Sequence, residues 1–189
     1  MTTKEMTKAA MFTAFACVAA IIARYGGEVL VPFSLMPLVV FLAGGLLGGR
    51  VAAVSMVVYV LLGLLGIPVF ASAPFGGVGY VLKPTFGFLL AYIATAWVIG
   101  TILKPGHRHS LAKYIGAMVL GLVVLYAIGL PYLYLMVNYY LGKTMSVATV
   151  IKVGALPFIG FDLIKLGIAS VISWKVNTRL EMARKEGTI

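Results

Sequence analysis

Long apolar stretches separated by short charged segments run through this chain of 189 residues. A helix that crosses about 30 Å of hydrocarbon needs roughly 20 residues, and lipid offers no water to satisfy an unpaired backbone. The pattern therefore predicts an all-α membrane protein, built as a bundle of six transmembrane helices. The predicted helices cover residues 8–24, 33–49, 51–67, 84–103, 114–138 and 155–175.

The composition agrees with one membrane domain. Hydrophobic residues make up 62% of the chain and charged residues 11%, whereas a soluble domain carries about 25% charge. The six helices use up the chain, so we expect a single integral membrane domain over residues 1–189. Lys4 and Lys8, which precede the first apolar segment, also fit a signal peptide. Cleavage would leave five spans with the two chain ends on opposite sides, which fits the charges less well.

The net charge is +10, and the distribution of the basic residues predicts how the chain is oriented in the membrane. With both termini inside, ten Lys and Arg residues fall on the cytoplasmic side, four fall outside, and Lys165 lies within a span. This is the positive-inside asymmetry of membrane proteins. We therefore expect a multi-pass protein of the cell membrane with cytoplasmic N- and C-termini. We do not expect nucleic-acid binding, because topology accounts for the basic excess.

Motifs for catalysis or metal binding are weak in this sequence. The single Cys excludes an internal disulfide and a thiolate-rich metal cluster. His107 and His109 have no carboxylate nearby in the sequence, so we expect neither a metal nor a cofactor. LGKT at 141–144 resembles the end of a phosphate loop, but Val137 stands where that loop needs Gly, so we expect no ATP hydrolysis.

Small residues recur at four-residue spacing on the first two predicted helices, which lets helix backbones approach closely. The glycine pairs favour packing inside the bundle. The alanine pairs fit such packing and a docking face for another membrane protein equally well. The pairs are Ala10 and Ala14, Ala16 and Ala20, Gly44 and Gly48, and Gly45 and Gly49.

Three irregular segments fall on the predicted outer side. Residues 66–88 are too apolar for an ordinary water-exposed loop, and their clustered glycines oppose a stable helix. We expect this segment to fold over the bundle as an extracellular lid between the third and fourth helices. An interfacial loop with no ligand beneath is the alternative. Two prolines predict that residues 28–37 are extended, and a proline and several tyrosines mark residues 129–140.

The last predicted helix holds an acid and a base, Asp162 and Lys165. Their spacing of three puts both on one helical face, about 7 and 12 Å below a helix start at Pro157 if the rise is 1.5 Å per residue. Each charge costs about 2.5 to 3.5 kcal/mol at mid-membrane, so both must face inward. The pair predicts either a mutually satisfied ion pair or a polar, outward-facing cavity for a ligand with donors and an anionic group.

Four sequence blocks closely resemble the BioY family, the biotin-specific S components of energy-coupling factor (ECF) transporters. The blocks begin VPFSLMPLVV, GGVGYVLKPT, GLPYL and LPFIGFDLIK, and cover residues 31–71, 76–100, 129–133 and 156–165. The resemblance implies a six-helix subunit that captures biotin outside and pairs with a transmembrane coupling protein and two ATPases. It also implies that Ala10 and Ala14 form the face that docks on the coupling protein.

Biotin carries a ureido ring, an apolar body and a carboxylate, and these match several side chains by chemistry. The Asp162 carboxylate can accept ureido N–H bonds, and the ammonium of Lys165 or Lys83 can meet the ligand's carboxylate or carbonyl; which cation takes which end stays open. The remaining candidates are Tyr80, Thr85 and Ser34 for polar contacts and Phe75, Tyr132 and Tyr139 for the apolar walls.

The sequence departs from the family pattern at Met36, Lys83 and Phe86, all at the proposed pocket rim. These departures leave the fold expectation intact and affect the expected ligand contacts. Another small vitamin or a precursor is the alternative ligand. A structural membrane subunit, and an enzyme that uses Asp162 as a general base, are alternatives from other classes, although the enzyme lacks a nucleophile or a metal.

Overall fold

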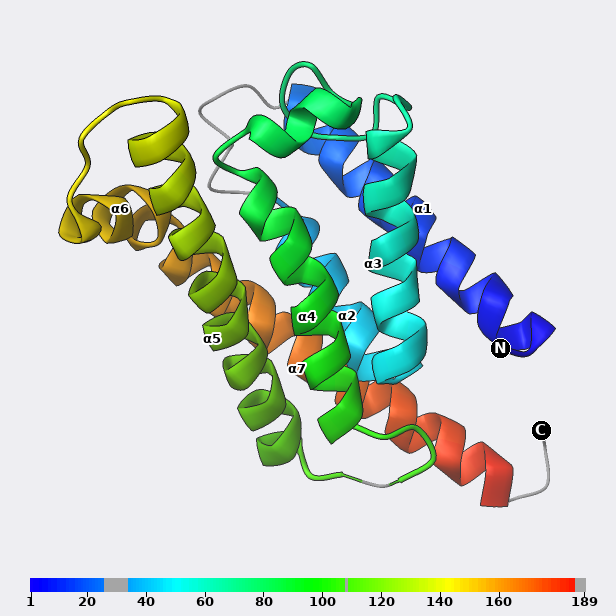
Figure 1. Ribbon diagram of the computed structural model, residues 1–189. Coiled ribbons are helices and arrows are strands. Elements are labelled where there is room, and N and C mark those ends of the chain that lie inside the picture. The colour runs from blue at the N-terminus through cyan, green and yellow to red at the C-terminus, as the bar shows by residue number, and fades with distance from the viewer. Residues whose placement is uncertain (26–33, 108, 186–189) are drawn as a thin grey trace.

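A computed structural model describes residues 1–25, 34–107 and 109–185 of the protein. Within these ranges the chain forms seven α-helices and no strand, which confirms the all-α prediction for the described part (Figure 1). A 3-10 helix, Val78–Leu82, precedes α4, and a π-helix, Met136–Tyr140, continues α5. The α-helices are α1 Thr3–Tyr25, α2 Met36–Leu47, α3 Gly49–Leu64, α4 Phe86–Ile102, α5 Leu111–Leu135, α6 Val147–Gly154 and α7 Leu156–Lys185.

Each of the six predicted ranges coincides mainly with one of the α-helices, and α6 is an additional short helix. In the part of the chain that the structure describes, three helical stretches are long and apolar enough to cross a membrane by themselves: Thr3–Tyr25, Leu111–Tyr140 and Leu156–Ala183. Helices α2, α3 and α4 are apolar but shorter. The chain is thus a membrane protein by composition and helix length, and the count of six spans stays a prediction.

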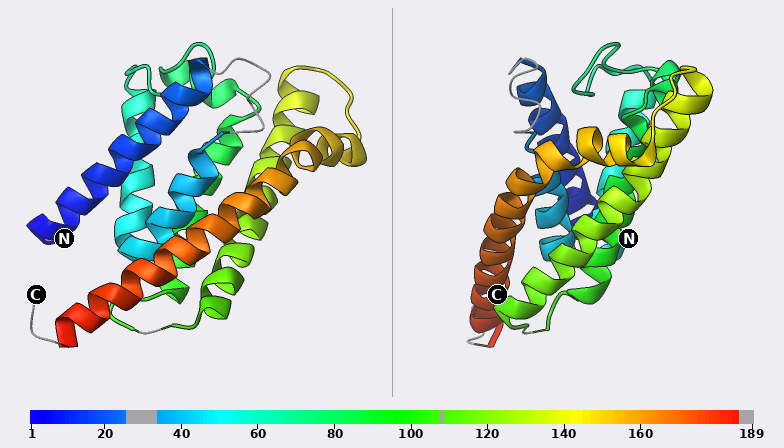
Figure 2. Two further views of the ribbon diagram at one scale, coloured as in Figure 1. Left: turned by 180° about the vertical axis from the view of Figure 1, so that it is seen from behind. Right: turned by 90° about the vertical axis from the view of Figure 1, so that its left-hand side faces the viewer.

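Helix α2 lies inside the bundle, in contact with α1, α3, α4 and α7. Figure 2 shows it between α1 and α7 in the view from behind. A Cβ atom on Gly44 would lie 2.7 Å from the Cβ of Ile99 in α4, and one on Gly45 would lie 2.5 Å from the hydroxyl oxygen of Ser173 in α7. A side chain at either position would force the neighbouring helix or side chain to move. The expectation that these glycines serve packing is therefore confirmed.

The two alanine pairs of α1 have different environments. Ala16 and Ala20 are fully buried against the bundle, whereas Ala10 and Ala14 are exposed. The hydroxyl of Thr13 donates to the carbonyl oxygen of Ser55 in α3 at 2.9 Å, which ties the inner face of α1 to α3. This packing favours a helix of the bundle over a signal peptide.

The segment expected to be extended before the second helix lies largely outside the described residues, namely at 26–33. Helix α2 begins at Met36, and Pro37 lies in its first turn. Proline is tolerated there because a backbone N–H in the first turn has no hydrogen-bond partner within the helix. Residue 37 is therefore helical and not extended. At the other end of α2, a single residue, Gly48, turns the chain into α3 with a φ of 80° that favours glycine.

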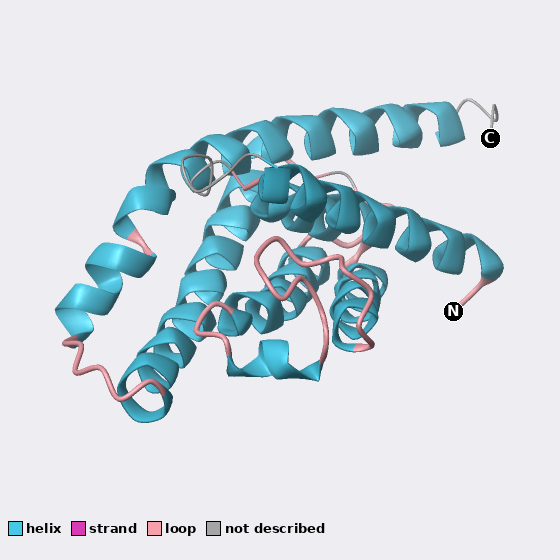
Figure 3. Ribbon diagram, turned by 90° about the horizontal axis from the view of Figure 1, so that it is seen from above, coloured by secondary structure: helices cyan, strands magenta, loops and turns pink. Residues whose placement is uncertain are grey.

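The bundle has two distinct ends. Helix α7 ends at the lower end in Figure 1, the end at which the connection between α4 and α5 lies, and α1 begins at the right-hand side. The segment between α3 and α4 lies at the upper end, and seen from above it faces the viewer over the bundle (Figure 3). Helix α6 packs beside α5 and the start of α7, and the hydroxyl of its N-cap residue, Ser146, accepts from the amide of Thr149 at 3.2 Å. The upper end is where the candidate site lies.

Candidate functional site

A pocket of about 400 Å³ lies among the upper halves of the helices, and its walls are mostly aromatic and aliphatic. The chain segment between α3 and α4 contributes part of the wall, as do all helices from α1 to α7. Its polar lining comprises Ser34, Ser72, Thr85, Asp162 and Lys165, with the hydroxyl groups of four tyrosines. The aromatic lining comprises Tyr59, Phe70, Tyr80, Phe88, Tyr92, Tyr126 and Phe158.

Asp162 and Lys165 enter this pocket from α7, as the three-residue spacing predicts. Their relative exposures are 4% and 8%, and the Lys165 ammonium donates to Asp162 Oδ1 at 2.8 Å. Leu163 and Ile164, on the other side of the same turn, are more than half exposed, at 51% and 61%. The inward orientation of the charged pair is therefore confirmed.

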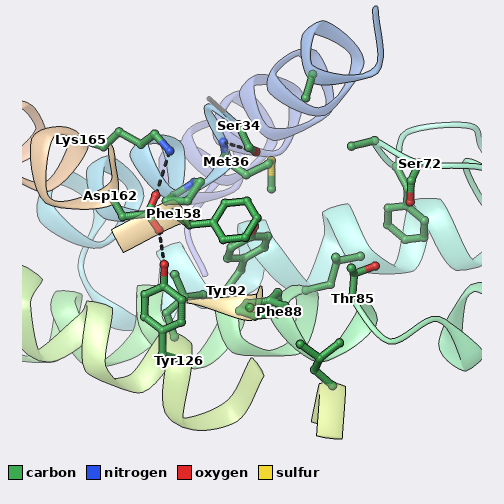
Figure 4. A pocket seen from close by; sticks show the side chains of 18 of the residues that line it. Ser34, Met36, Ser72, Thr85, Phe88, Tyr92, Tyr126, Phe158, Asp162 and Lys165 are labelled. Carbon is green, nitrogen blue, oxygen red and sulfur yellow. Dashed lines mark hydrogen bonds and ion pairs between the residues drawn. The ribbon is translucent and has the colours of Figure 1, made fainter. Parts of the chain in front are cut away.

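A tyrosine from a different helix completes this polar cluster. The hydroxyl of Tyr126 in α5 donates to Asp162 Oδ2 at 2.8 Å (Figure 4). Each carboxylate oxygen thus accepts one bond from the protein. Because an ionised carboxylate offers about four lone-pair sites, each oxygen can still accept a donor from a ligand. An ammonium carries three N–H donors, so the neighbouring Lys165 can also donate to an acceptor group of a ligand.

The polar groups are separated along the pocket. Figure 4 shows Asp162 and Lys165 at one end and Ser72 toward the other, with aromatic rings between them. At the Ser72 end, the Ser72 and Tyr80 hydroxyls are 2.8 Å apart, and the Lys83 ammonium donates to Ser72 at 3.4 Å. This arrangement suits an elongated molecule with an apolar middle and a polar group at each end.

The segment between α3 and α4 is packed against the bundle. The Phe70 ring is fully buried, and a Cβ atom on Gly63 would lie 2.0 Å from it. The ring centroids of Phe70 and Tyr80 are 4.3 Å apart. The amide of Gly77 also donates to the carbonyl oxygen of Gly63 at 2.7 Å. The segment packs on the upper end of the bundle, and its role as a lid stays a prediction.

Five of the nine predicted binding residues line the pocket: Ser34, Tyr80, Thr85, Asp162 and Lys165. The other four are described by the structure but do not line it. Lys83 reaches the pocket wall through Ser72, as given above. The ring of Phe75 lies 4.1 Å from the guanidinium of Arg24. Tyr132 donates its hydroxyl to the carbonyl of Val81, so it braces the segment between α3 and α4 from outside.

Tyr139 points away from the site. It lies in the π-helix that follows α5 and is 79% exposed. The tyrosine-rich end of α5 therefore lines the pocket with fewer rings than its sequence pattern indicates.

The sequence model of the BioY family matches residues 1–182. The chain belongs to the BioY family. "Probable biotin transporter BioY" of Lysinibacillus sphaericus is 40% identical over 90% of this chain and 84% of that protein. "Biotin transporter BioY" of Thermotoga maritima is 36% identical over 96% of this chain and 99% of that protein. BioY-family membership places the chain among transport proteins and not among enzymes.

A solved structure shares the fold of this BioY-family chain. It is described as the crystal structure at 2.1 Å of the S component for biotin from an ECF-type ABC transporter. The TM-score is 0.75 at 26% sequence identity, and the match covers 94% of this chain and 95% of that one. The fold is therefore that of an S component.

Several lining residues of this BioY-family chain were not among the predicted ones. Tyr126 and Tyr92 lie in the middle of apolar helices, where a hydroxyl group needs a partner inside the protein. That requirement is a usable signal, although it does not name the partner. Phe70 and Phe88 carry no comparable signal, because a phenylalanine ring has no polar group that requires a partner.

Proposed function

We propose that this BioY-family chain is the substrate-binding membrane subunit, or S component, of an ECF-type ABC importer for biotin. It captures biotin from outside and delivers it to the cytoplasm. The observation that carries this proposal is the buried Asp162 and Lys165 pair at one end of an otherwise apolar pocket. The names of the relatives support the choice of biotin. Biotin is the transported ligand, and no cofactor is needed.

The pocket matches biotin in size and in chemical pattern. Its volume of about 400 Å³ falls in the range of roughly 300 to 1,000 Å³ that is usual for small-molecule sites. One edge of a ureido ring presents an N–H donor beside a carbonyl acceptor. The carboxylate of Asp162 and the ammonium of Lys165, 2.8 Å apart, present an acceptor beside a donor. We place the ureido ring at this end, between these two groups.

The other parts of biotin follow from that placement. The thiophane ring and the aliphatic chain lie among the aromatic side chains, including Tyr92 and Phe88. The biotin carboxylate then extends toward Ser72 and Tyr80, where the ammonium of Lys83 is 3.4 Å from the Ser72 hydroxyl. Lys83 thus provides a positive charge beside the carboxylate end without lining the empty pocket. Thr85 and Ser34 supply further hydroxyl groups to the pocket lining.

Transport requires partners in addition to the binding subunit. We propose that both termini are cytoplasmic, that six helices span the membrane, and that the segment over residues 66–83 is the extracellular lid. A transmembrane coupling protein docks on the exposed Ala10 and Ala14 face of α1. Two ATPases supply the energy, and the loaded subunit releases biotin on the inner side. The chain itself does no chemistry on its ligand.

The direct test is to extract small molecules from the purified protein, identify them by mass spectrometry, and then titrate the emptied protein with biotin. We expect biotin in the extract and saturable binding at or below micromolar concentration. Absence of biotin together with no binding at micromolar concentration would refute the ligand assignment and leave the fold unaffected.

One observation favours a second ligand of the same class. Met36, a departure from the family pattern, lines the pocket and replaces a polar contact by a flexible apolar one. A vitamin precursor with fewer polar groups at that position would be favoured by this substitution. Competition between biotin and its sulfur-free precursor, desthiobiotin, in the same titration separates the two ligands.

A further inference from the structure

We propose that Arg24 is a positioning residue that holds the pocket wall between α3 and α4 in place and connects it to α1. This inference rests on the proposed function, because the wall matters for transport only if the pocket holds the ligand. Arg24 does not line the pocket and lies in the last turn of α1. Its effect on the ligand is therefore exerted through the segment that it contacts.

The guanidinium of Arg24 has three contacts with this segment. One terminal nitrogen donates to the carbonyl oxygens of Pro68 and Phe70, the latter at 2.8 Å. The same guanidinium lies over the Phe75 ring, 4.1 Å from its centroid. The two hydrogen bonds join residues 44 and 46 positions apart in the sequence. A planar guanidinium can donate to two acceptors and lie flat on a ring at the same time, whereas an ammonium has no planar surface that can stack on a ring.

The anchored backbone carries part of the pocket wall. Phe70 is fully buried and lines the pocket, as do Ala71 and Ser72 after it. Between the two anchored carbonyls lies Val69, whose own carbonyl accepts from the Tyr59 hydroxyl of α3 at 3.3 Å. Residues 68–70 are thus held from α1 by Arg24 and from α3 by Tyr59. Loss of the α1 anchor leaves this stretch with one side-chain attachment fewer and lets the wall open more often.

The anchor also gives α1 an influence on the ligand. The inner face of α1 packs on the bundle through Ala16 and Ala20, while Ala10 and Ala14 face outward. A displacement of α1 pulls on residues 68–70 through the guanidinium. Ligand release is then coupled to movement of the helix that carries the proposed docking face.

A simpler role for Arg24 is a favourable charge at the C-terminus of a helix. The two roles predict different results for Arg24→Lys. Lysine keeps the positive charge but lacks the fork and the planar surface. If the charge alone matters, Arg24→Lys behaves like the wild type. If Arg24 holds the wall, Arg24→Lys resembles Arg24→Gln.

The first measurement is the dissociation rate of labelled biotin from the purified protein, by chase with unlabelled biotin. We expect Arg24→Gln and Arg24→Lys to release biotin about ten- to hundredfold faster than the wild type, as for loss of hydrogen bonds to a charged group. The matched control is Thr13→Val, which removes the bond from α1 to Ser55 but does not touch the wall, and should change the rate less than about threefold. Dissociation from both Arg24 variants at the wild-type rate would overturn the proposal. So would a wild-type rate for Arg24→Lys alone.

A second measurement does not depend on the ligand. Cys17 is the single cysteine of the chain, so Val69→Cys in a Cys17→Ala background carries one thiol, at a position that is 7% exposed. Maleimide reaches this thiol when the wall opens. We expect maleimide to label this thiol about tenfold faster when Arg24→Gln is added, because the same hydrogen bonds are lost.

The two measurements separate the two proposals. Equal labelling rates with and without Arg24 would refute the role of Arg24 whatever the ligand. Failure of the wild type to bind biotin, with faster labelling of the Arg24 variant, would refute the proposed ligand and keep the anchor. The unfolding temperatures of all variants, measured without ligand, show whether a change in rate reflects a general loss of structure. A lower unfolding temperature in both Arg24 variants without faster labelling would count against the proposal.

Discussion

The buried pair of Asp162 and Lys165 predicts different results for stability and for ligand binding. The two side chains are 4% and 8% exposed, and the ammonium contacts Asp162 Oδ1 at 2.8 Å. Asp162→Asn removes the negative charge and leaves the buried ammonium without this carboxylate. Removal of one partner from a buried ion pair costs about 3 to 5 kcal/mol, whereas replacement of both partners by groups of similar size is roughly neutral.

These free energies translate into melting temperatures. For a chain of this size each kcal/mol corresponds to about 2 to 4 °C, so Asp162→Asn should lower the melting temperature by roughly 6 to 20 °C. The double variant Asp162→Asn with Lys165→Met should melt within a few degrees of the wild type and should no longer bind biotin. If the pair is only structural, the double variant keeps biotin binding; if the pair binds the ligand, the double variant loses it. The melting temperature of Asp162→Asn falls in both cases and does not separate them.

The assay is thermal unfolding in detergent with and without biotin, together with a binding titration. Biotin at a hundred times its dissociation constant should stabilise the wild type by about 2.7 kcal/mol. The double variant should show no such shift. Lys175→Met, at an exposed position of the same helix, is the control for the lysine substitution. Tight biotin binding by the double variant would refute the assignment of the pair to the ligand, and an unchanged melting temperature for Asp162→Asn would refute the energetic argument.

Three further substitutions have defined outcomes. Tyr126→Phe removes the hydroxyl bond to the buried carboxylate and should weaken biotin binding about tenfold or more, whereas Tyr114→Phe, at the far end of the same helix, should not. Gly63→Ala adds a Cβ atom 2.0 Å from a pocket-lining phenylalanine ring and should cost about 1 to 3 kcal/mol in stability. Gly116→Ala has open space and should cost nothing by the same melting assay. Ala14→Leu enlarges an exposed position, so biotin binding should persist while cellular uptake of labelled biotin falls; normal uptake would contradict the docking proposal.

Much of the architecture was predictable because it depends on local chain chemistry. Uninterrupted apolar stretches locate the long helices, since backbone groups in lipid must pair within their own segment. The inward orientation of Asp162 and Lys165 follows from the cost of a charge in hydrocarbon and from their spacing of three. The short helix α6 was missed, because eight residues are too few for a membrane-span pattern.

The contacts that define the site depend on which helices meet, and the local pattern does not contain that information. Tyr126 reaches Asp162 across 36 positions, and Arg24 reaches the wall across 44 and 46. The local pattern also did not indicate the exposure of Tyr139, 79%, or the π-helix in which it lies. The sequence by itself determined which segments lie in the membrane and which polar side chains require a partner inside the protein. Only the tertiary structure decided the partners, because close packing of several helices selects them jointly from many side chains that are chemically equivalent.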